Sequence, residues 1–114
     1  MRFDALLFDM DGTLTDSMPL HDRSWLAWHE ELGLPFDADG FFEATAGRSI
    51  TEIVTDMMRE HRPGLGPVEI AALGERKEAL FREIARRELQ LIRGAAEVLA
   101  TARAKGLKLA ICTG

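Results

Sequence analysis

Residues 5–15 read Ala-Leu-Leu-Phe-Asp-Met-Asp-Gly-Thr-Leu-Thr, and the rest of the fold can be worked out from this stretch. The four apolar residues 5–8 form a short run of the kind found in strands that are buried on both faces. Asp9 ends the run abruptly, and Gly12 allows the chain to turn sharply. The stretch therefore predicts a buried parallel strand that leads into a tight loop with two acids, Asp9 and Asp11.

Four further segments have the apolar spacing of amphipathic helices. At the start of the second segment, Ser49 and Glu52 have the spacing of a capping box, in which each side chain bonds a backbone N–H group. Gly33 suits the position just after the first helix, and Pro67 suits the first turn of the third. The predicted helices cover about residues 19–32, 50–61, 67–89 and 95–105.

A second apolar run, residues 107–112, predicts another strand. Strands that are separated by a helix normally run parallel, so their carboxyl ends meet at one edge of the sheet. Ligands bind at this edge in open α/β sheets, and Asp9 and Thr113 should therefore face one site. We expect an α/β chain with a Rossmann-like parallel core, of which only the first strands are present, and an inserted α-helical cap. The core is predicted to comprise residues 1–15 and 92–114, and the cap residues 16–91.

Composition and charge exclude several classes of partner. The 114 residues are 46% hydrophobic and 29% charged, which suits one modest core. A net charge of -5 disfavours nucleic acid and anionic membranes, because both need a basic surface. The longest apolar runs are far too short to span a membrane. Cys112 has no partner for a disulfide, which favours a reducing cytoplasm, and its apolar run predicts a position in the core.

The two acids belong to a pattern, D-x-D-G-T-L, that lies close to the N-terminus. After a buried strand, this stretch resembles the first motif of phosphatases and phosphomutases of the haloacid dehalogenase superfamily. A calcium loop of the EF-hand type would need Gly at its sixth position and an acid at its twelfth, but Leu14 and Leu20 stand there. The resemblance implies a Mg²⁺-dependent hydrolase of phosphoric monoesters, and Asp11 disfavours a true dehalogenase.

Phosphate monoesters hydrolyse extremely slowly, so a nucleophile, positioning and charge neutralisation must act together. By the resemblance, Asp9 would attack phosphorus and form an aspartyl-phosphate, with Mg²⁺ on its other oxygen reducing the repulsion between two anions. Asp11 would protonate the leaving oxygen and bind the metal through its backbone carbonyl. Phosphate contacts are implied for four residues: Met10, Asp11, Thr113 of the second motif, and Gly114.

In the predicted cap the likeness extends to β-phosphoglucomutase and related sugar-phosphate phosphatases. By that likeness Asp16 and Ser17 would be hinge residues. His21 would lie near the catalytic acid, and Arg48 would contact the far end of the substrate. For His21 and Arg48, a plain surface position is the competing interpretation. Four other side chains are predicted to be solvated on helix surfaces: His29, His61, Arg76 and Lys77.

Members of the family continue past the second motif with a lysine that clamps nucleophile and phosphate, and with an acidic pair that completes the metal site. Neither follows Thr113 here, so we expect a truncated chain that is inactive alone and self-associates through uncovered strands. The intact enzyme is expected to be a monomer. Arg93 also stands where relatives usually have a proline before Gly94, which changes the stiffness of the hinge and not the chemistry.

Three functions stay open on the sequence. The favoured one is a phosphatase that acts on a small phosphorylated metabolite of the sugar phosphate or phosphoglycolate type. A β-phosphoglucomutase-like phosphomutase shares the first motif and returns the phosphoryl group to a sugar. The third is a non-catalytic domain of the same fold that binds a protein partner through the cap surface.

Overall fold

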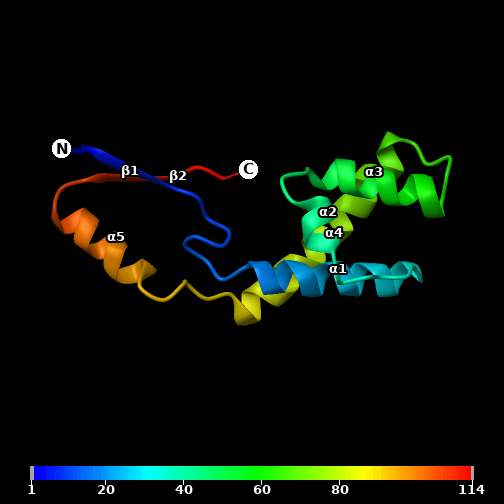
Figure 1. Ribbon diagram of the computed structural model, residues 1–114, viewed down its shortest axis with the longest axis horizontal. Helices are drawn as coiled ribbons and strands as arrows, with labels where there is room; N and C mark the ends of the chain where they lie inside the picture. Colours follow the sequence, from blue (N-terminus) through cyan, green and yellow to red (C-terminus); the bar gives the residue numbers. More distant parts are fainter. Residues whose placement is uncertain (1, 114) are drawn as a thin grey trace. The chain divides into compact units, whose positions relative to one another are not determined.

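A computed structural model describes residues 2–113 of the chain (Figure 1). Its contacts group into two compact units. The sheet unit consists of the described residues up to Leu20 and from Ala85 onward, and the helical unit is His21–Ile84. The elements, in chain order, are β1 (Ala5–Phe8), α1 (Met18–Leu32), α2 (Phe41–Thr45), α3 (Ile50–His61), α4 (Pro67–Glu88), α5 (Ala95–Ala104) and β2 (Lys108–Ile111).

The sheet unit is built on two parallel strands, with α5 preceding β2 in the chain and contacting it. The pairing register places Phe8 of β1 opposite Ile111 of β2. Hydrogen bonds continue past both ends, because the Lys108 N–H donates to the Asp4 carbonyl (3.0 Å) and the Cys112 N–H donates to the Phe8 carbonyl (2.8 Å). The predicted parallel strands and the α/β class are confirmed, and the carboxyl ends of both strands lie at one edge.

Both strands are more exposed than their apolar sequences predict. β1 alternates between exposed and half-buried residues, and β2 is exposed throughout. Leu7 is 70% exposed and Ile111 is 57% exposed. The prediction of a strand buried on both faces is therefore wrong for the part of the chain that the structure describes, and Cys112, expected in the core, is exposed as well. Two four-residue strands and one packed helix are too few elements to cover both faces of a parallel sheet.

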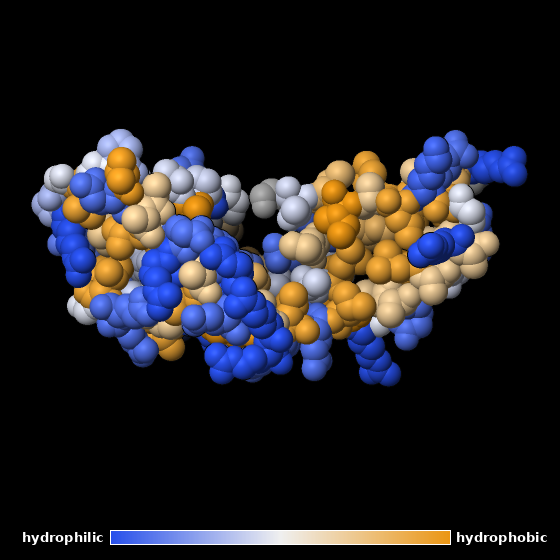
Figure 2. Space-filling model, turned by 180° about the vertical axis from the view of Figure 1, so that it is seen from behind, coloured by the Kyte–Doolittle hydropathy of each residue, from blue (hydrophilic) through white to orange (hydrophobic). Residues whose placement is uncertain are grey.

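Apolar side chains gather on the surface of the sheet unit, which is the orange region on the right of Figure 2. A hollow of about 340 Å³ lies between the sheet and α5, with Leu6, Val98 and Leu107 in its lining. Contiguous apolar surface of this kind is unusual on a folded unit, in contrast to scattered single residues. The large exposed hydrophobic residues of this unit are Phe3, Leu7, Leu89, Leu91, Val98, Leu109 and Ile111.

The helical unit has a core of its own. Trp28 and Val54 are 0% exposed, and the Trp28 indole N–H donates to the Leu73 carbonyl of α4 at 2.9 Å. The rings of Trp25 and Trp28 meet edge to face with centroids 5.3 Å apart, which is a favoured aromatic geometry. The buried cluster unites α1, α3 and α4 and contains Trp25, Trp28, Ile53, Val54, Met58, Ile70 and Leu80.

The helix ends follow the signals in the sequence. At the start of α3, the Ser49 hydroxyl accepts the Glu52 N–H and the Glu52 carboxylate accepts the Ser49 N–H, which is the predicted capping box. At the end of α1, Gly33 has a φ of +68° and the Leu34 N–H donates to the His29 carbonyl (2.9 Å), as in a Schellman motif. The bounds of the four predicted helices are confirmed to within one residue. The five-residue α2 was not predicted, because so short a helix shows no clear period.

Two side chains that were predicted to be solvated are buried. His29 is 4% exposed and Lys77 is 3% exposed. The Lys77 ammonium lies over the Trp25 ring, 5.1 Å from its centroid, and the His29 ring packs against Phe36 with centroids 4.6 Å apart. Polarity alone predicted solvent exposure, whereas packing partners from other segments cover both residues. The predicted exposure of His61 and Arg76 is confirmed.

The predicted cap, residues 16–91, contains the whole helical unit, and its limits stay a prediction. Within residues 2–113, no helix combines the length and the apolar character that a membrane crossing requires.

Candidate active site

Asp9 and Thr113 lie just beyond the carboxyl ends of the two strands. Asp9 follows the last residue of β1, and Thr113 lies two residues after β2. Because the strands are parallel and the ladder continues to Cys112, both residues belong to the same edge of the sheet. Both are exposed, so a ligand at this edge can reach them. Gly114, a further predicted phosphate contact, lies outside the described residues.

The loop after β1 is organised around the carbonyl of Met10. This oxygen accepts the N–H groups of Leu14 (2.9 Å) and Thr15 (3.1 Å) and the Thr15 hydroxyl (3.2 Å). Gly12 has a φ of +75°, and its N–H donates to the Thr15 carbonyl at 2.9 Å. A Cβ added at Gly12 would be 3.6 Å from Met18 Cγ, an ordinary contact. The backbone conformation, and not lack of space, therefore requires glycine here.

The exit of the loop is bonded to the segment that precedes α5. The Ile92 N–H donates to the Leu14 carbonyl (2.8 Å), and the Asp16 N–H donates to the Gln90 carbonyl (2.9 Å). Leu14 is 6% exposed, so its side chain is shielded from solvent at this point. The loop that holds both acids is thus fixed at its start by β1 and at its end by residues 90–92.

Asp11 is half-buried, and Ser17 holds its carboxylate. The Ser17 hydroxyl donates to Asp11 Oδ1 at 2.6 Å, and Ser17 itself is 1% exposed. A hydroxyl bond to a carboxylate is one of the stronger hydrogen bonds in proteins. Asp9 is exposed, so the two acids have different surroundings, as two different chemical roles require. The sequence suggested only a hinge at Ser17, because a contact six residues away around a turn follows no periodic pattern.

The two acids are suitable as part of a metal site. Magnesium prefers carboxylate, carbonyl and water oxygens, and Asp9 and Asp11 provide such oxygens at the sheet edge. Residues 2–113 contain no group of three or more His, Cys, Asp or Glu side chains that could hold an ion. These two residues therefore fit a Mg²⁺ ion, but they can provide only some of its oxygen ligands.

In the helical unit, His21 belongs to a cluster with Lys77 and Phe81. Its ring stacks on Phe81 with centroids 3.9 Å apart and planes 5° from parallel. Its Nδ1 lies 2.8 Å from Lys77 Nζ, and a protonated lysine can only donate, so Nδ1 is the acceptor. Lys77 Nζ is also 3.6 Å from the Glu78 carboxylate. His21 is therefore more constrained than a plain surface histidine, and its predicted place beside the catalytic acid stays a prediction.

Arg48 is bonded within its own unit. Its guanidinium donates to the Asp56 carboxylate, whose other oxygen accepts from Arg59 at 3.2 Å. The hydrogen bond from Arg48 is the main reason that the pKa of Asp56 lies below its ordinary value. The Arg48 side chain is still 36% exposed. A substrate group that binds Arg48 would have to share it with Asp56 or replace that carboxylate.

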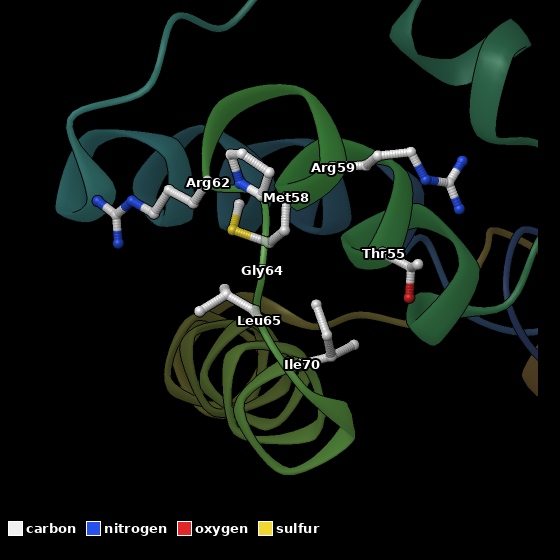
Figure 3. A pocket seen from close by; sticks show the side chains of 8 residues that line it. Thr55, Met58, Arg59, Arg62, Gly64, Leu65 and Ile70 are labelled. Atoms are coloured by element: carbon white, nitrogen blue, oxygen red, sulfur yellow. The ribbon is translucent and has the colours of Figure 1, made fainter.

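A second hollow, of about 200 Å³, lies between α3 and the start of α4 (Figure 3). The side chains of Met58 and Ile70 line it, whereas the guanidinium groups of Arg59 and Arg62 point away on opposite sides. Arg62 instead donates to the Leu32 carbonyl at the end of α1 (2.7 Å). An active site needs polar groups that converge, and the polar groups around this hollow diverge.

Comparison with known proteins identifies relatives of the chain. A 6-phosphogluconate phosphatase of Escherichia coli (strain K12) is 32% identical over 102 residues, which cover 86% of this chain and 43% of that protein. The crystal structure of CbbY from Rhodobacter sphaeroides in complex with phosphate superposes with a TM-score of 0.79 at 29% identity, covering 98% of this chain and 51% of that one. A putative β-phosphoglucomutase from Bacteroides vulgatus gives a TM-score of 0.75 at 30% identity, covering 98% and 45%.

The chain spans about half the length of the curated relatives that it matches. Nearly all of it is matched by one family model, which extends from residue 3 to residue 114. The acidic loop after β1, the parallel partner strand and the helical unit all lie within this range. The chain belongs to the haloacid dehalogenase-like hydrolases.

Proposed function

We propose that this chain is the nucleophile-bearing part of a Mg²⁺-dependent phosphatase that acts on a small phosphorylated metabolite. The observation that supports this most directly is the loop after β1, in which two acids with different surroundings lie at the carboxyl edge of parallel strands. Family membership makes phosphoryl transfer the expected chemistry of such a loop. The substrate is of the sugar phosphate or phosphoglycolate type.

In the proposed reaction, an Asp9 carboxylate oxygen attacks phosphorus, and the bond from phosphorus to the leaving oxygen breaks. The Asp11 carboxyl gives its proton to that oxygen, so the alcohol leaves neutral and an aspartyl-phosphate remains. Asp11 then takes a proton from water as the water oxygen attacks the same phosphorus. This releases inorganic phosphate and restores the Asp9 carboxylate. When bound by the Asp9 carboxylate and the Asp11 carbonyl, Mg²⁺ would neutralise charge between the two anions.

The remaining site residues bind and position the substrate. We assign the phosphoryl contacts to the Thr113 hydroxyl and to the backbone N–H groups of Met10 and Asp11. In the helical unit, His21 and Arg48 are the proposed contacts for the rest of the substrate. Asp56 already satisfies part of the Arg48 guanidinium, so Arg48 suits a substrate group that competes well with a carboxylate.

The names of the relatives support a phosphorylated sugar derivative as substrate. One relative is a phosphatase of 6-phosphogluconate, and the CbbY structure holds phosphate. The second candidate function, a phosphomutase, is favoured by the similarity to the putative β-phosphoglucomutase. The two are separated by the acceptor of the phosphoryl group, because a phosphatase releases inorganic phosphate and a mutase forms an isomeric sugar phosphate. Phosphorus NMR of the products distinguishes these outcomes.

Titration of the full-length protein with Mg²⁺ and beryllium fluoride tests the nucleophile, because this fluoride complex mimics a phosphoryl group on a carboxylate. We expect calorimetric binding that requires Mg²⁺ and disappears in Asp9→Asn. The matched control is Asp4→Asn, an exposed acid next to the other end of β1, which should bind as the unmodified protein does. Absence of binding in the unmodified protein would favour the non-catalytic domain.

A further inference from the structure

His29 lies inside an aromatic cluster of the helical unit. Its side chain is 4% exposed, and its Nδ1 donates to the Trp25 carbonyl one turn earlier at 2.6 Å. The ring centroids of Trp28 and Phe36 are 5.0 and 4.6 Å away, and that of Phe41 is 5.9 Å away. Beside this hydrogen bond, the ring is surrounded by aromatic side chains.

The rings around His29 come from separate segments. Trp25 and Trp28 belong to α1, Phe36 lies in the connection after α1, and Phe41 begins α2. Phe36 and Phe41 also pack on each other with centroids 5.1 Å apart. His29 is thus a principal packing contact between α1 and residues 34–45. We call residues 34–45 the connecting segment.

Protonation of His29 would put a charge among these rings. The neutral ring satisfies Nδ1 through the Trp25 carbonyl, whereas the imidazolium has a second N–H, on Nε2, and a positive charge to solvate. The titratable neighbour that acts electrostatically on the ring is His61 at the end of α3, while α2 contributes Phe41 and the connecting segment contributes Phe36. Burial holds the pKa of His29 below its ordinary value, His61 lowers it further, and the bond to Trp25 opposes both effects.

We propose that His29 forms a pH-sensitive contact, and that its protonation releases the connecting segment from α1. The inference rests on packing within the helical unit and does not depend on the proposed phosphatase activity. The pH dependence of stability follows from the linkage between protonation and folding. A histidine that prefers the neutral form in the folded state contributes stability above its unfolded pKa, near 6.5, and that contribution is lost as the pH falls from there through the folded pKa.

The test is a pH titration of the protein followed by NMR, with histidine ring signals and amide hydrogen exchange measured together. We expect His29 to titrate below pH 6.5. As it does so, exchange in residues 34–45 should accelerate by about tenfold for each unit by which the folded pKa is lowered. Amides in the middle of α4 should show no matching change once the intrinsic pH dependence of exchange is subtracted.

Two variants complete the test. His29→Phe keeps a ring of similar size without a titratable group, and the exchange of the connecting segment should then lose its pH dependence. His61→Asn removes the other histidine of this region and should keep most of that dependence. An unmodified His29 that titrates at or above pH 6.5 would refute the proposal, and this measurement stands even if His29→Phe fails to fold. The proposal would also be refuted if hydrogen exchange in the connecting segment kept its pH dependence in a folded His29→Phe variant.

Discussion

The two units of this chain differ in where their apolar residues lie. In the helical unit, Trp28 and Val54 are completely buried, whereas in the sheet unit Leu7 and Ile111 are more than half exposed. The helical unit therefore obtains its core from its own residues. The sheet unit has a loop with several hydrogen bonds but little apolar cover. The acids proposed to be catalytic belong to the unit with the less complete core, so chemistry and stability should respond to different substitutions.

The largest expected effect is that of Asp9→Asn on activity. Loss of the nucleophile should lower kcat by roughly 10⁴- to 10⁶-fold and abolish the phosphoenzyme. Because Asp9 is exposed and lies outside the helical core, the thermal unfolding of the helical unit should not change. Rapid-quench detection of phosphoenzyme, together with circular dichroism, measures both. Activity near that of the unmodified protein would disprove the role of Asp9.

Asp11→Asn should separate binding from turnover. The asparagine keeps the backbone carbonyl and the shape of the side chain but cannot transfer a proton, so kcat should fall by roughly 10²- to 10⁴-fold. Phosphate or beryllium fluoride should still bind. Calorimetry and steady-state kinetics on one preparation compare the two properties. An equal loss of binding and turnover would contradict a role limited to proton transfer.

A pair of core substitutions tests the comparison of the units directly. Trp28→Ala should destabilise the protein by about 3–5 kcal/mol, because it leaves a cavity and removes the hydrogen bond from the indole to the Leu73 carbonyl. Leu7→Ala, on a side chain that is 70% exposed, should change stability by only about 0.5 kcal/mol. Urea unfolding followed by far-ultraviolet circular dichroism measures both variants, and the fluorescence of the tryptophans reports the helical unit separately. A large loss of stability in Leu7→Ala would show that this face of the sheet is covered in solution.

Ser17→Ala tests the contact that the sequence did not reveal. The variant removes the hydroxyl that donates to Asp11 Oδ1 and little else, so the acid is held less firmly. We expect kcat to fall by about tenfold, the value of one hydrogen bond to a charged group, with KM nearly unchanged. Ser17→Thr keeps the hydroxyl and should recover most of the rate. A fall in protein stability without a fall in kcat would indicate a purely structural role.

Much of the fold could be predicted from local signals. Two helix starts could be predicted because their signals act within one turn. These signals are the capping box at Ser49 and Glu52 and Pro67 in the first turn of α4. The parallel order of the strands followed from the helix between them. Asp9 and Thr113 could be placed at one sheet edge by the same argument.

Burial could not be predicted as well, because it depends on partners that are distant in the sequence. The apolar run of β1 indicates a strand that suits a covered position, but it does not say whether this chain provides the cover. Lys77 and His29 are polar residues on helices, and only the rings contributed by other segments make them buried. The Ser17 hydroxyl reaches Asp11 only because the loop folds back around the Met10 carbonyl.

The smallest expected effect is that of Arg76 on α4, and its neighbour Lys77 provides the contrast. Arg76 is exposed and donates to the Glu31 carboxylate from Nε at 2.9 Å, and its loss in Arg76→Met should barely change the Tm, with any change vanishing in high salt. Lys77→Met keeps the apolar stem among the rings but removes the donor to His21 Nδ1, which should cost about 1–3 kcal/mol. Thermal unfolding at low and high salt compares the two variants. Because the residues are adjacent and both cationic, a larger and salt-insensitive loss at Lys77 can only reflect its burial, and equal losses would mean that Lys77 is as solvated as its sequence suggested.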